Sequence, residues 1–596
     1  MQTSVNKNGF SVRAYTGDAK TLLTFDLVKT KTANLAGFTI SCTPPGQPEY
    51  YIYNLLQFKD PSVHAQNKTE PANSSINAPI QKFRWLHVPG NLKNENLKYG
   101  GYIYHATPRY FDDKGILLPL DKSLTADIKV NVDYFSSGTI ALGFTRGFVQ
   151  SQAFEHHFGK TLVLQPKSRP LQFDTSQEAG KNADGNPFTY MDEYTWSGFT
   201  ARKRIFDLLA EIEKDKLSVD VFAYDFNEPD IVAAFLKLAA AGRIRMILDS
   251  AALHLDKKNK KTGKVSPSPE NLFTTAFNKV KTGDAAIQRG KYGRYAHDKV
   301  FILKKDGTPV KLLTGSTNFS VTGMYVNSNH LLIFSDPDIA GLYGQVFDKS
   351  WADNESAPDF SKSTLATQAF HFPAKNPTMD FAFSPHSEDF AKSYLDAITT
   401  RIISEKSSVL FAVMDTGDNG TGPIFPALRG LHTNQAIFSY GISDNPGGIT
   451  LYKPGSKTGV IVTGKPISAQ LPPPFNQEAS VGIGHQVHHK FVVCGFNTAN
   501  AEVFCGSSNL ALGGEQENGD NLISIRDQDV ATVFALEALA LVDHFHFRDA
   551  NQVIKKTTAK APKIVQKPVF LYHTNKWALS YYDTNDFHYT DRMLFR

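Results

Sequence analysis

Two segments of the chain carry the same polar residues at the same intervals. The first reads YAHDKVFIL and then TGSTNFSVTGMYVNSN, and the second reads QVHHKFVVC and then CGSSNLALGGEQENGD. Both follow the order His-x-Lys, Gly-Ser-x-Asn and a further polar pair. The repeated residues are His297, Lys299, Ser316, Asn318, Asn327 and Asn329 in the first segment and His488, Lys490, Ser507, Asn509, Asn518 and Asp520 in the second. One His-x-Lys triplet is common by chance, but two copies with matched downstream residues indicate a duplicated site.

These residue types suit chemistry on a phosphate diester. His and Lys two positions apart on a strand point to the same face. An imidazole can attack phosphorus or move a proton, while an ammonium group holds a phosphate oxygen. Ser and Asn add neutral donors, and two imidazoles on opposite sides of the phosphorus serve an in-line displacement. Donors from both segments would replace a metal ion, so the sequence predicts no metal and no cofactor.

The double motif resembles the phospholipase D superfamily, whose signature is His-x-Lys followed by Gly-Ser-x-Asn, in two copies or in dimers of one. The resemblance covers about residues 196–548. It implies that one His forms a phosphohistidine while the other protonates the leaving alcohol and then activates water or an acceptor alcohol. By this resemblance His297, Lys299, His488, Lys490 and Asp520 are catalytic, Ser316, Asn318, Ser507 and Asn509 bind phosphate, and Asn327, Asn329 and Asn518 support the site.

The chain departs from the family pattern at two points. The family has Asp five residues after the motif Lys, where this chain has Lys304 and Gly495. Further downstream the second segment has the acid Asp520, whereas the first has Asn329. A carboxylate on one imidazole nitrogen fixes the tautomer and makes the other nitrogen more basic. On this argument alone, with Asp520 orienting His488, His488 is the better nucleophile; family precedent favours His297, and the two roles stay open.

Length and composition exclude several classes of protein. The chain has 596 residues, 41% hydrophobic and 20% charged, a globular profile without collagen-like or disordered character. No apolar run is long enough for a transmembrane helix, and the first residues show no secretory signal. Three cysteines exclude a disulfide scaffold. We therefore expect a soluble protein, either cytoplasmic or exported by a route without a visible signal.

The order of the predicted strands and helices indicates an α/β fold. We expect two phospholipase D-like sandwich domains related by a pseudo-twofold axis, preceded by an all-β domain. Short strand-like runs such as TLLTFDLV and TIALGFT fill the first part, and helices alternate with buried strands after it. The expected divisions are a β-sandwich accessory domain (1–165), a linker (166–195), the first catalytic half (196–353), a connector (354–386), the second catalytic half (387–548) and a basic, aromatic C-terminal tail (549–596).

The predicted function is a metal-independent phosphodiesterase that hydrolyses or transfers the headgroup of glycerophospholipids. A nuclease acting on DNA or RNA is one alternative, and a non-enzymatic phosphate-binding module is another. The net charge is only +5, but a lysine-rich run, KKNKKTGK, covers residues 257–264. A run with this charge is suited to binding an anionic surface, such as anionic lipid or nucleic acid. We expect a phosphodiester substrate, phospholipid rather than nucleic acid, peripheral membrane contact, and a monomer in which the two halves form an intramolecular pseudo-dimer.

Overall fold

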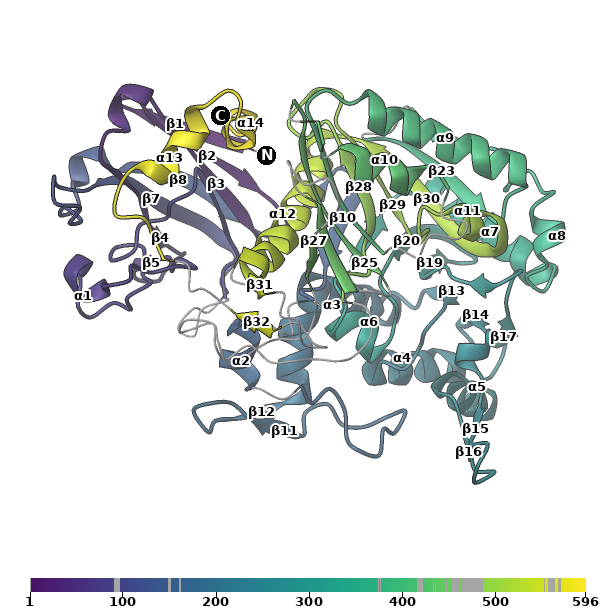
Figure 1. Cartoon of the computed structure of the whole chain (residues 1–596). Helices are drawn as coiled ribbons and strands as arrows, with labels where there is room; N and C mark the ends of the chain where they lie inside the picture. The colour runs from purple at the N-terminus through teal and green to yellow at the C-terminus, as the bar shows by residue number, and fades with distance from the viewer. Residues whose placement is uncertain are drawn as a thin grey trace.

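The computed structural model describes residues 2–90, 97–147, 152–159, 162–373, 375, 377–414, 422–431, 433–434, 436–445, 448–452, 460–462, 486–550, 553–555, 563–565 and 570–596. Figure 1 shows an N-terminal β domain beside two larger α/β sheets. Mixed α/β architecture after an all-β N-terminal part is what the sequence predicts.

Two four-stranded sheets form the N-terminal β domain. One has the order β1-β2-β3-β6 and the other β5-β4-β7-β8. Alternation of polar and apolar residues turns one face of each strand inward, as in ADIKVNV of β8, where every second residue is buried. The strands are β1 (Gln2–Lys7), β2 (Phe10–Thr16), β3 (Thr21–Leu27), β4 (Leu35–Thr43), β5 (Tyr50–Tyr51), β6 (Arg84–His87), β7 (Gly100–Tyr110) and β8 (Ala126–Val132), with α1 (Pro61–His64) in a connection.

The end of the chain returns to this β domain. The short helices α13 (Lys576–Leu579) and α14 (Phe587–Leu594) lie beside it, in yellow against purple (Figure 1). The indole nitrogen of Trp577 donates to the carbonyl of Leu35 at 3.0 Å, and the ring packs in the β-domain core. Phe595 instead packs on Phe438 and Phe496 of the far sheet, with ring centroids 5.5 Å apart in both pairs. The tail thus ties the β domain to the second α/β sheet; of its residues, 551–552, 556–562 and 566–569 lie outside the described part.

The first α/β sheet has eight strands in the order β17-β14-β13-β19-β20-β21-β10-β9. They are β9 (Ser136–Ser137), β10 (Ile140–Phe144), β13 (Ser218–Ala223), β14 (Ile244–Asp249), β17 (Ala286–Gly290), β19 (Val300–Lys305), β20 (Thr308–Gly315) and β21 (His330–Phe334). Its helices are α3 (Tyr190–Lys214), α4 (Pro229–Ala240), α5 (Pro269–Val280), α6 (Val321–Tyr325), α7 (Pro337–Ala352) and α8 (Ala357–Phe360).

Two elements lie differently from the predicted divisions. The run TIALGFT, expected in the β-sandwich, forms β10 and pairs with β21 of the eight-stranded sheet, because its apolar side chains pack in the core that the two α/β sheets share. Helix α3 begins inside the expected linker, at Tyr190, where Thr189 and Asp192 form a capping box. The expected linker also contains the small hairpin of β11 (Glu178–Lys181) and β12 (Pro187–Thr189), and α2 (Gln152–Phe158) precedes it, within the expected β-sandwich domain.

The second α/β sheet follows the order β22-β23-β30-β29-β28-β24-β25-β26-β27. Its elements are β22 (Phe370–Phe372), β23 (Thr378–Ser384), α9 (Glu388–Ser404), β24 (Ser408–Met414), α10 (Ile424–Leu431), β25 (Phe438–Asn445), β26 (Gly448–Tyr452), β27 (Val460–Val462), β28 (Lys490–Cys494), β29 (Glu502–Gly506), α11 (Leu512–Glu517), β30 (Asn518–Arg526) and α12 (Gln528–Ala550). Its path β25-β24-β28-β29-β30-β23 pairs in the same senses as β14-β13-β19-β20-β21-β10: the first pair is parallel and the others are antiparallel.

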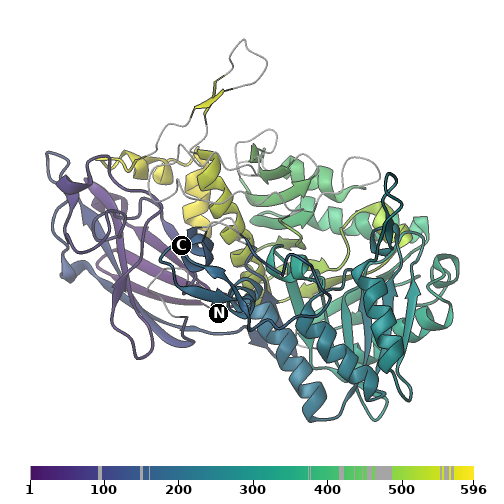
Figure 2. The same cartoon turned by 90° about the horizontal axis from the view of Figure 1, so that it is seen from below.

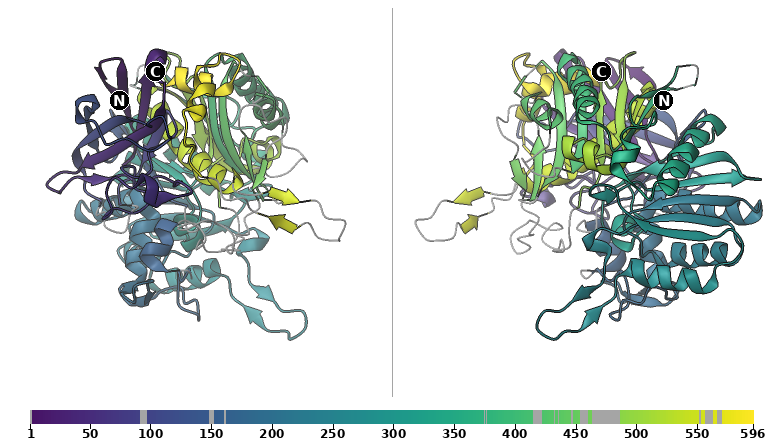
Figure 3. Two further views of the ribbon diagram at one scale, coloured as in Figure 1. Left: turned by 60° about the vertical axis from the view of Figure 1, so that its left-hand side comes forward. Right: turned by 90° about the vertical axis from the view of Figure 1, so that its right-hand side faces the viewer.

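One apolar core joins the two sheets. It contains inward residues of both, such as Phe334 and Phe381, whose ring centroids lie 5.6 Å apart, together with residues of α7 and α12. A separate core under α3, α4 and α5 covers the outer face of the first sheet, and another under α9 and α10 covers that of the second. Figures 2 and 3 show these outer helices on opposite sides of the paired sheets. Of the described helices, not one has the length and apolar character to cross a bilayer.

Candidate active site

The two His-x-Lys segments enter the site in the same way. His297 follows β18 (Tyr295–Ala296) and leads into β19, while His488 leads into β28. A buried aspartate at the end of a parallel strand holds the residues just before each His. Asp249, ending β14, accepts from the backbone N–H of Ala296 at 2.7 Å, and Asp444, on β25, accepts from that of Val487 at 3.1 Å. These carboxylates fix where each motif begins.

Asp520 lies against the histidine of the other half. Its Oδ1 is 2.7 Å from Nδ1 of His297, and both side chains are buried. The expectation that Asp520 acts on His488 within its own half is therefore wrong. The segment preceding His297 crosses to the second sheet, where β18 pairs in parallel with β30 and His297 N–H donates to Gly519.

Asn329 occupies the equivalent place beside His488. The amide oxygen of Asn329 is 2.8 Å from Nδ1 of His488, and the Asn329 amide nitrogen donates to the carbonyl of Gly323 at 2.7 Å. The backbone also crosses between the two halves here, because Ser328 forms a parallel bridge with Val487. Each half thus supplies the group that orients the histidine of the other, a carboxylate in one case and an amide in the other.

The residues that follow these pairs also cross between the halves. Asp298 Oδ1 accepts from the side-chain amide of Asn521 at 2.6 Å, and His489 Nδ1 lies 3.3 Å from Nδ1 of His330. Burial raises the pKa of Asp298 to about 7 and lowers that of His330 well below its usual range. Sequence reasoning assigned none of these four residues to the site, although each stands directly after one that it did assign.

The two motif lysines are buried beside the histidines. Lys299 Nζ donates to the carbonyl of His297, and Lys490 Nζ to that of His488 at 3.0 Å. Burial lowers the pKa of Lys299 to about 8, although the carboxylates of Asp520 and Asp298 favour its charged form. Burial and the two lysines also hold the pKa of His297 well below its usual range, so its ring is neutral near pH 7.

The Ser and Asn of the second motif differ in their contacts. Ser316 Oγ accepts from the backbone N–H of His330 at 3.1 Å, and Ser507 Oγ accepts from that of Asn521 at 2.9 Å. These hydroxyls therefore form hydrogen bonds to the backbone of the neighbouring strands. The side-chain oxygens of Asn318 and Asn509, by contrast, are buried without a hydrogen-bond partner among the described residues.

The supporting asparagines lie next to the orienting groups. Asn518 donates from its side-chain nitrogen to Asp520 Oδ2 at 3.1 Å, while Ser384 donates to the Asn518 carbonyl at 2.9 Å. In the first half the carbonyl of Asn327 accepts from Thr145 Oγ1 at 2.5 Å. Burial raises the pKa of Asp520 to about 6, against the attraction of Lys299 and the bond from Asn518. Asp520 therefore remains an anion at neutral pH.

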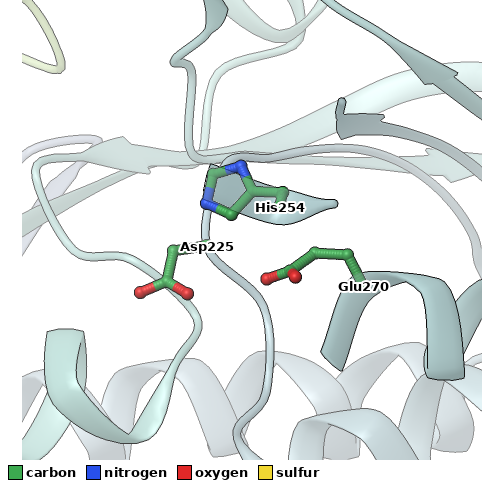
Figure 4. A group of neighbouring side chains, drawn as sticks. All are labelled: Asp225, His254 and Glu270. Carbon is green, nitrogen blue, oxygen red and sulfur yellow. The ribbon is translucent and has the colours of Figure 1, made fainter. Parts of the chain in front are cut away.

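A second cluster of polar side chains lies near His297, on the other side of the Tyr224 ring. The ring of Tyr224 contacts those of His297 and His254 edge-on, with centroids 4.8 and 4.5 Å apart. His254 meets Asp225 and Glu270, with one donor atom of each within 4.8 Å of the others (Figure 4). Such nitrogen and carboxylate donors suit Zn²⁺ or Mn²⁺. The sequence predicted no metal; these residues come from three separate elements and no local motif marks them.

A buried ionic chain connects the site to the N-terminal β domain. Lys20 donates to Glu537 of α12, and Glu537 Oε1 lies 3.5 Å from Nε2 of His489. All three side chains are buried, and Lys20 Nζ also lies 5.4 Å from the centre of the Phe144 ring. The β domain therefore contacts the residue between His488 and Lys490 through a single side chain of α12.

Parts of the chain are similar to known proteins. Residues 208–351 match the family model described as "Cardiolipin synthase, PLD-like domain". This part of the chain therefore resembles a phospholipase D-like domain. The mitochondrial cardiolipin hydrolase of Xenopus tropicalis is 26% identical over 151 residues, which is 25% of this chain and 62% of that protein. The chain thus spans less than two thirds of this curated relative.

Two solved structures are also similar to parts of the chain. Nuc of Salmonella typhimurium, described as a phospholipase D family member, is 22% identical and covers 25% of this chain and 86% of its own, with a TM-score of 0.19. The phosphatidylserine synthase of Haemophilus influenzae is 9% identical over 61% of this chain and 85% of its own, with a TM-score of 0.37.

The missing phospholipase D aspartates have different substitutes in the two halves. Lys304 donates to Asp220 on the neighbouring strand β13 at 2.6 Å, so a salt bridge joins β19 to β13 at this position. Gly495 has a φ of +68°, a backbone conformation that side-chain-bearing residues rarely adopt, and it begins the turn after β28. Neither position contacts the two histidines.

Proposed function

We propose that the chain is a metal-independent phosphodiesterase in which His297 is the nucleophile and His488 the general acid and base. The observation that carries this assignment is the contact between His297 and Asp520 across the two halves. With the proton on Nδ1 donated to the carboxylate, the tautomer is fixed and the lone pair of Nε2 is free to attack.

Two further features support His297 as the nucleophile. Its lowered pKa keeps the ring neutral, as an attacking nitrogen must be. Its partner Asp520 is in turn fixed by Asn518. In the first step the Nε2–phosphorus bond forms and the bond from phosphorus to the leaving alcohol oxygen breaks. In the second step water attacks phosphorus and the bond to His297 breaks.

His488 suits the movement of protons. Its Nδ1 meets a neutral amide, which orients the ring without adding negative charge. It gives a proton to the leaving oxygen in the first step and takes one from water in the second. An acceptor alcohol in place of water would give transfer instead of hydrolysis.

The remaining motif residues divide between binding and positioning. Lys299 and Lys490 supply positive charge for the non-bridging oxygens, and Asn318 and Asn509 supply amide donors. For Ser316 and Ser507 we propose a positioning role rather than direct phosphate binding, because their hydroxyls already fasten β21 and β30. Asn327, Asn329 and Asn518 hold the orienting groups.

The two catalytic halves are proposed to be related by a pseudo-twofold axis within one monomer. The support is the matched order of strands and the reciprocal contacts: His297 with Asp520, and His488 with Asn329. Residues 196–353 and 387–548 remain the proposed catalytic halves, and β10 would extend the first half at its N-terminal side.

A glycerophospholipid headgroup is the proposed substrate. The family model that matches is named for cardiolipin synthase, and the curated relative above is named a cardiolipin hydrolase. A nuclease is the second candidate, because the same chemistry cleaves nucleic acid diesters.

Paired assays in EDTA test the proposal. The full chain is incubated with vesicles of mixed phospholipids and, separately, with single-stranded DNA, and both products are followed. His297→Ala is the inactive variant, and His371→Ala, an exposed histidine on β22, is the matched control.

Headgroup release by wild type and His371→Ala, but not by His297→Ala, is the expected result. DNA cleavage with the same dependence would make the protein a nuclease. No product from either substrate would favour the non-enzymatic phosphate-binding module.

A further inference from the structure

A lysine-rich hairpin projects from the active-site end of the first sheet. It consists of β15 (Lys257–Lys258) and β16 (Val265–Ser266) and stands away from the body of the protein at the lower right of Figure 1 and in both views of Figure 3. Its lysines are Lys257, Lys258, Lys260, Lys261 and Lys264, all exposed. The sequence from Lys257 to Pro269 contains no acidic residue, so the hairpin is a concentrated positive charge.

Large apolar side chains are exposed beside these lysines. Leu253 is 60% exposed, Leu255 44% and Val265 52%, and Leu272 follows on α5 at 41%. Val265 lies directly opposite Lys258 across the hairpin. Apolar side chains interleaved with lysines are typical of surfaces that insert into the headgroup layer of a membrane. They would gain nothing against the phosphate backbone of a nucleic acid.

Hydrogen bonds hold the base and the tip of the hairpin. Asp256 accepts from the backbone N–H of Ser268 at 2.9 Å and from the side-chain amide of Asn271 at 2.7 Å. At the tip, the side-chain oxygen of Asn259 accepts from the N–H groups of Lys261 and Thr262. The lysines therefore stand on an element that is hydrogen-bonded at both of its ends.

The same base is coupled to the active site. Asp249 Oδ1 lies 2.7 Å from Nδ1 of His254, which precedes the hairpin, while its Oδ2 accepts from Ala296 N–H, just before His297. The ring of Tyr224 lies between those of His254 and His297. A surface bound by the hairpin would thus lie beside the catalytic histidine.

We propose that this hairpin, with Leu253, Leu255 and Val265, docks the protein on a membrane rich in anionic phospholipid and delivers its substrate to His297. The inference rests on the proposed function and specifies the physical form of the substrate, a lipid surface. Each lysine brought to an anionic bilayer strengthens binding about fivefold, and the effect declines as salt screens the charge.

Vesicle co-sedimentation of the full chain tests the docking. The vesicles are pure phosphatidylcholine or phosphatidylcholine with about a third phosphatidylglycerol, each at low and high salt. One variant replaces the five hairpin lysines by Gln, and a second carries Leu253→Ser, Leu255→Ser and Val265→Ser. The matched control replaces five exposed lysines of the β domain by Gln: Lys59, Lys68, Lys114, Lys122 and Lys129.

The expected result is binding to the anionic vesicles alone, weakened by salt, weakened at least a hundredfold in the lysine variant and clearly weakened in the apolar variant. The β-domain control should bind like wild type. Equal binding by all variants, loss in the control instead, or hairpin-dependent binding to single-stranded DNA without vesicle binding would each overturn the proposal.

Hydrolysis of a soluble diester, bis(p-nitrophenyl) phosphate, separates this proposal from the proposed function. The hairpin variants should hydrolyse it at the wild-type rate while headgroup release from anionic vesicles falls. If wild type hydrolyses neither substrate, the proposed function fails, and the co-sedimentation still decides whether the hairpin docks on membranes.

Discussion

Nδ1 of His297 and Oδ1 of Asp520 lie 2.7 Å apart, although the two residues belong to different halves of the chain. The equivalent pair, His488 and Asn329, lies 2.8 Å apart. The two contacts have the same geometry and differ in charge. Their difference gives a direct test of the roles of the two histidines.

Asp520→Asn should lower kcat on a phosphodiester by about 10²- to 10⁴-fold, because an amide no longer stabilises the protonated Nδ1 of His297 or guarantees its tautomer. Asn329→Asp is the mirror-image change and should alter kcat far less. Steady-state kinetics on bis(p-nitrophenyl) phosphate measures both. A larger loss in Asn329→Asp than in Asp520→Asn would reverse the assignment.

A change of leaving group should distinguish the roles of the two histidines. His488→Ala should lower kcat by about 10²- to 10⁴-fold for an alcohol leaving group, which needs a proton, and much less for p-nitrophenolate, which does not. His297→Ala should abolish turnover of both substrates. Peptide mass spectrometry of acid-free digests should find phosphohistidine at His297 in His488→Ala, and a label on His488 in the wild type would contradict this.

The pH dependence should be bell-shaped. Because Asp520 must be ionised, kcat/KM should fall as the pH drops below about 6. Because Lys299 must be charged, kcat/KM should fall again as the pH rises above about 8. Asp520→Asn should remove the acidic limb and Lys299→Gln the alkaline one, each at a lower overall rate. A wild-type profile that is flat from pH 5 to 9 would show that neither group controls the reaction.

The buried contact between Lys20 and Glu537 should matter for stability. Lys20→Met leaves the Glu537 carboxylate buried without its cation and should cost about 3–5 kcal/mol in the free energy of unfolding. The double variant Lys20→Met, Glu537→Met replaces both charges by apolar side chains and should recover most of that loss. Urea unfolding followed by tryptophan fluorescence measures the difference; equal losses in the single and double variants would contradict the pairing.

The sequence predicted the elements of the two α/β halves because their periodicity is strong and their ends are marked. PDIVAAFLKLAAAG forms α4 from Pro229 to Ala240, with Glu228 as its N-cap, and SSVLFAVM forms β24. The position of TIALGFT was wrong because a short apolar strand does not reveal which sheet it will join. Only long-range packing decides between the two.

The candidate residues could be predicted from the sequence, but the contacts between them could not. Repetition in the sequence identified His297, His488, Asp520 and Asn329, yet it carried no information about which acid meets which imidazole. That pairing follows from the crossing of β18 to β30, a contact between residues far apart in the chain. Asp225, His254 and Glu270 come together in the same way, from separate loops and a helix end.

The crossed contacts have a consequence for how such a protein can diverge. In a homodimer of a single-motif subunit, one gene encodes both orienting residues, so both histidines must have identical partners. Joining two copies in one polypeptide removes that constraint, and a carboxylate can be kept at one crossing while the other becomes an amide. The Asp520 and Asn329 positions show this difference: matched positions of the repeat carry an acid at one crossing and an amide at the other.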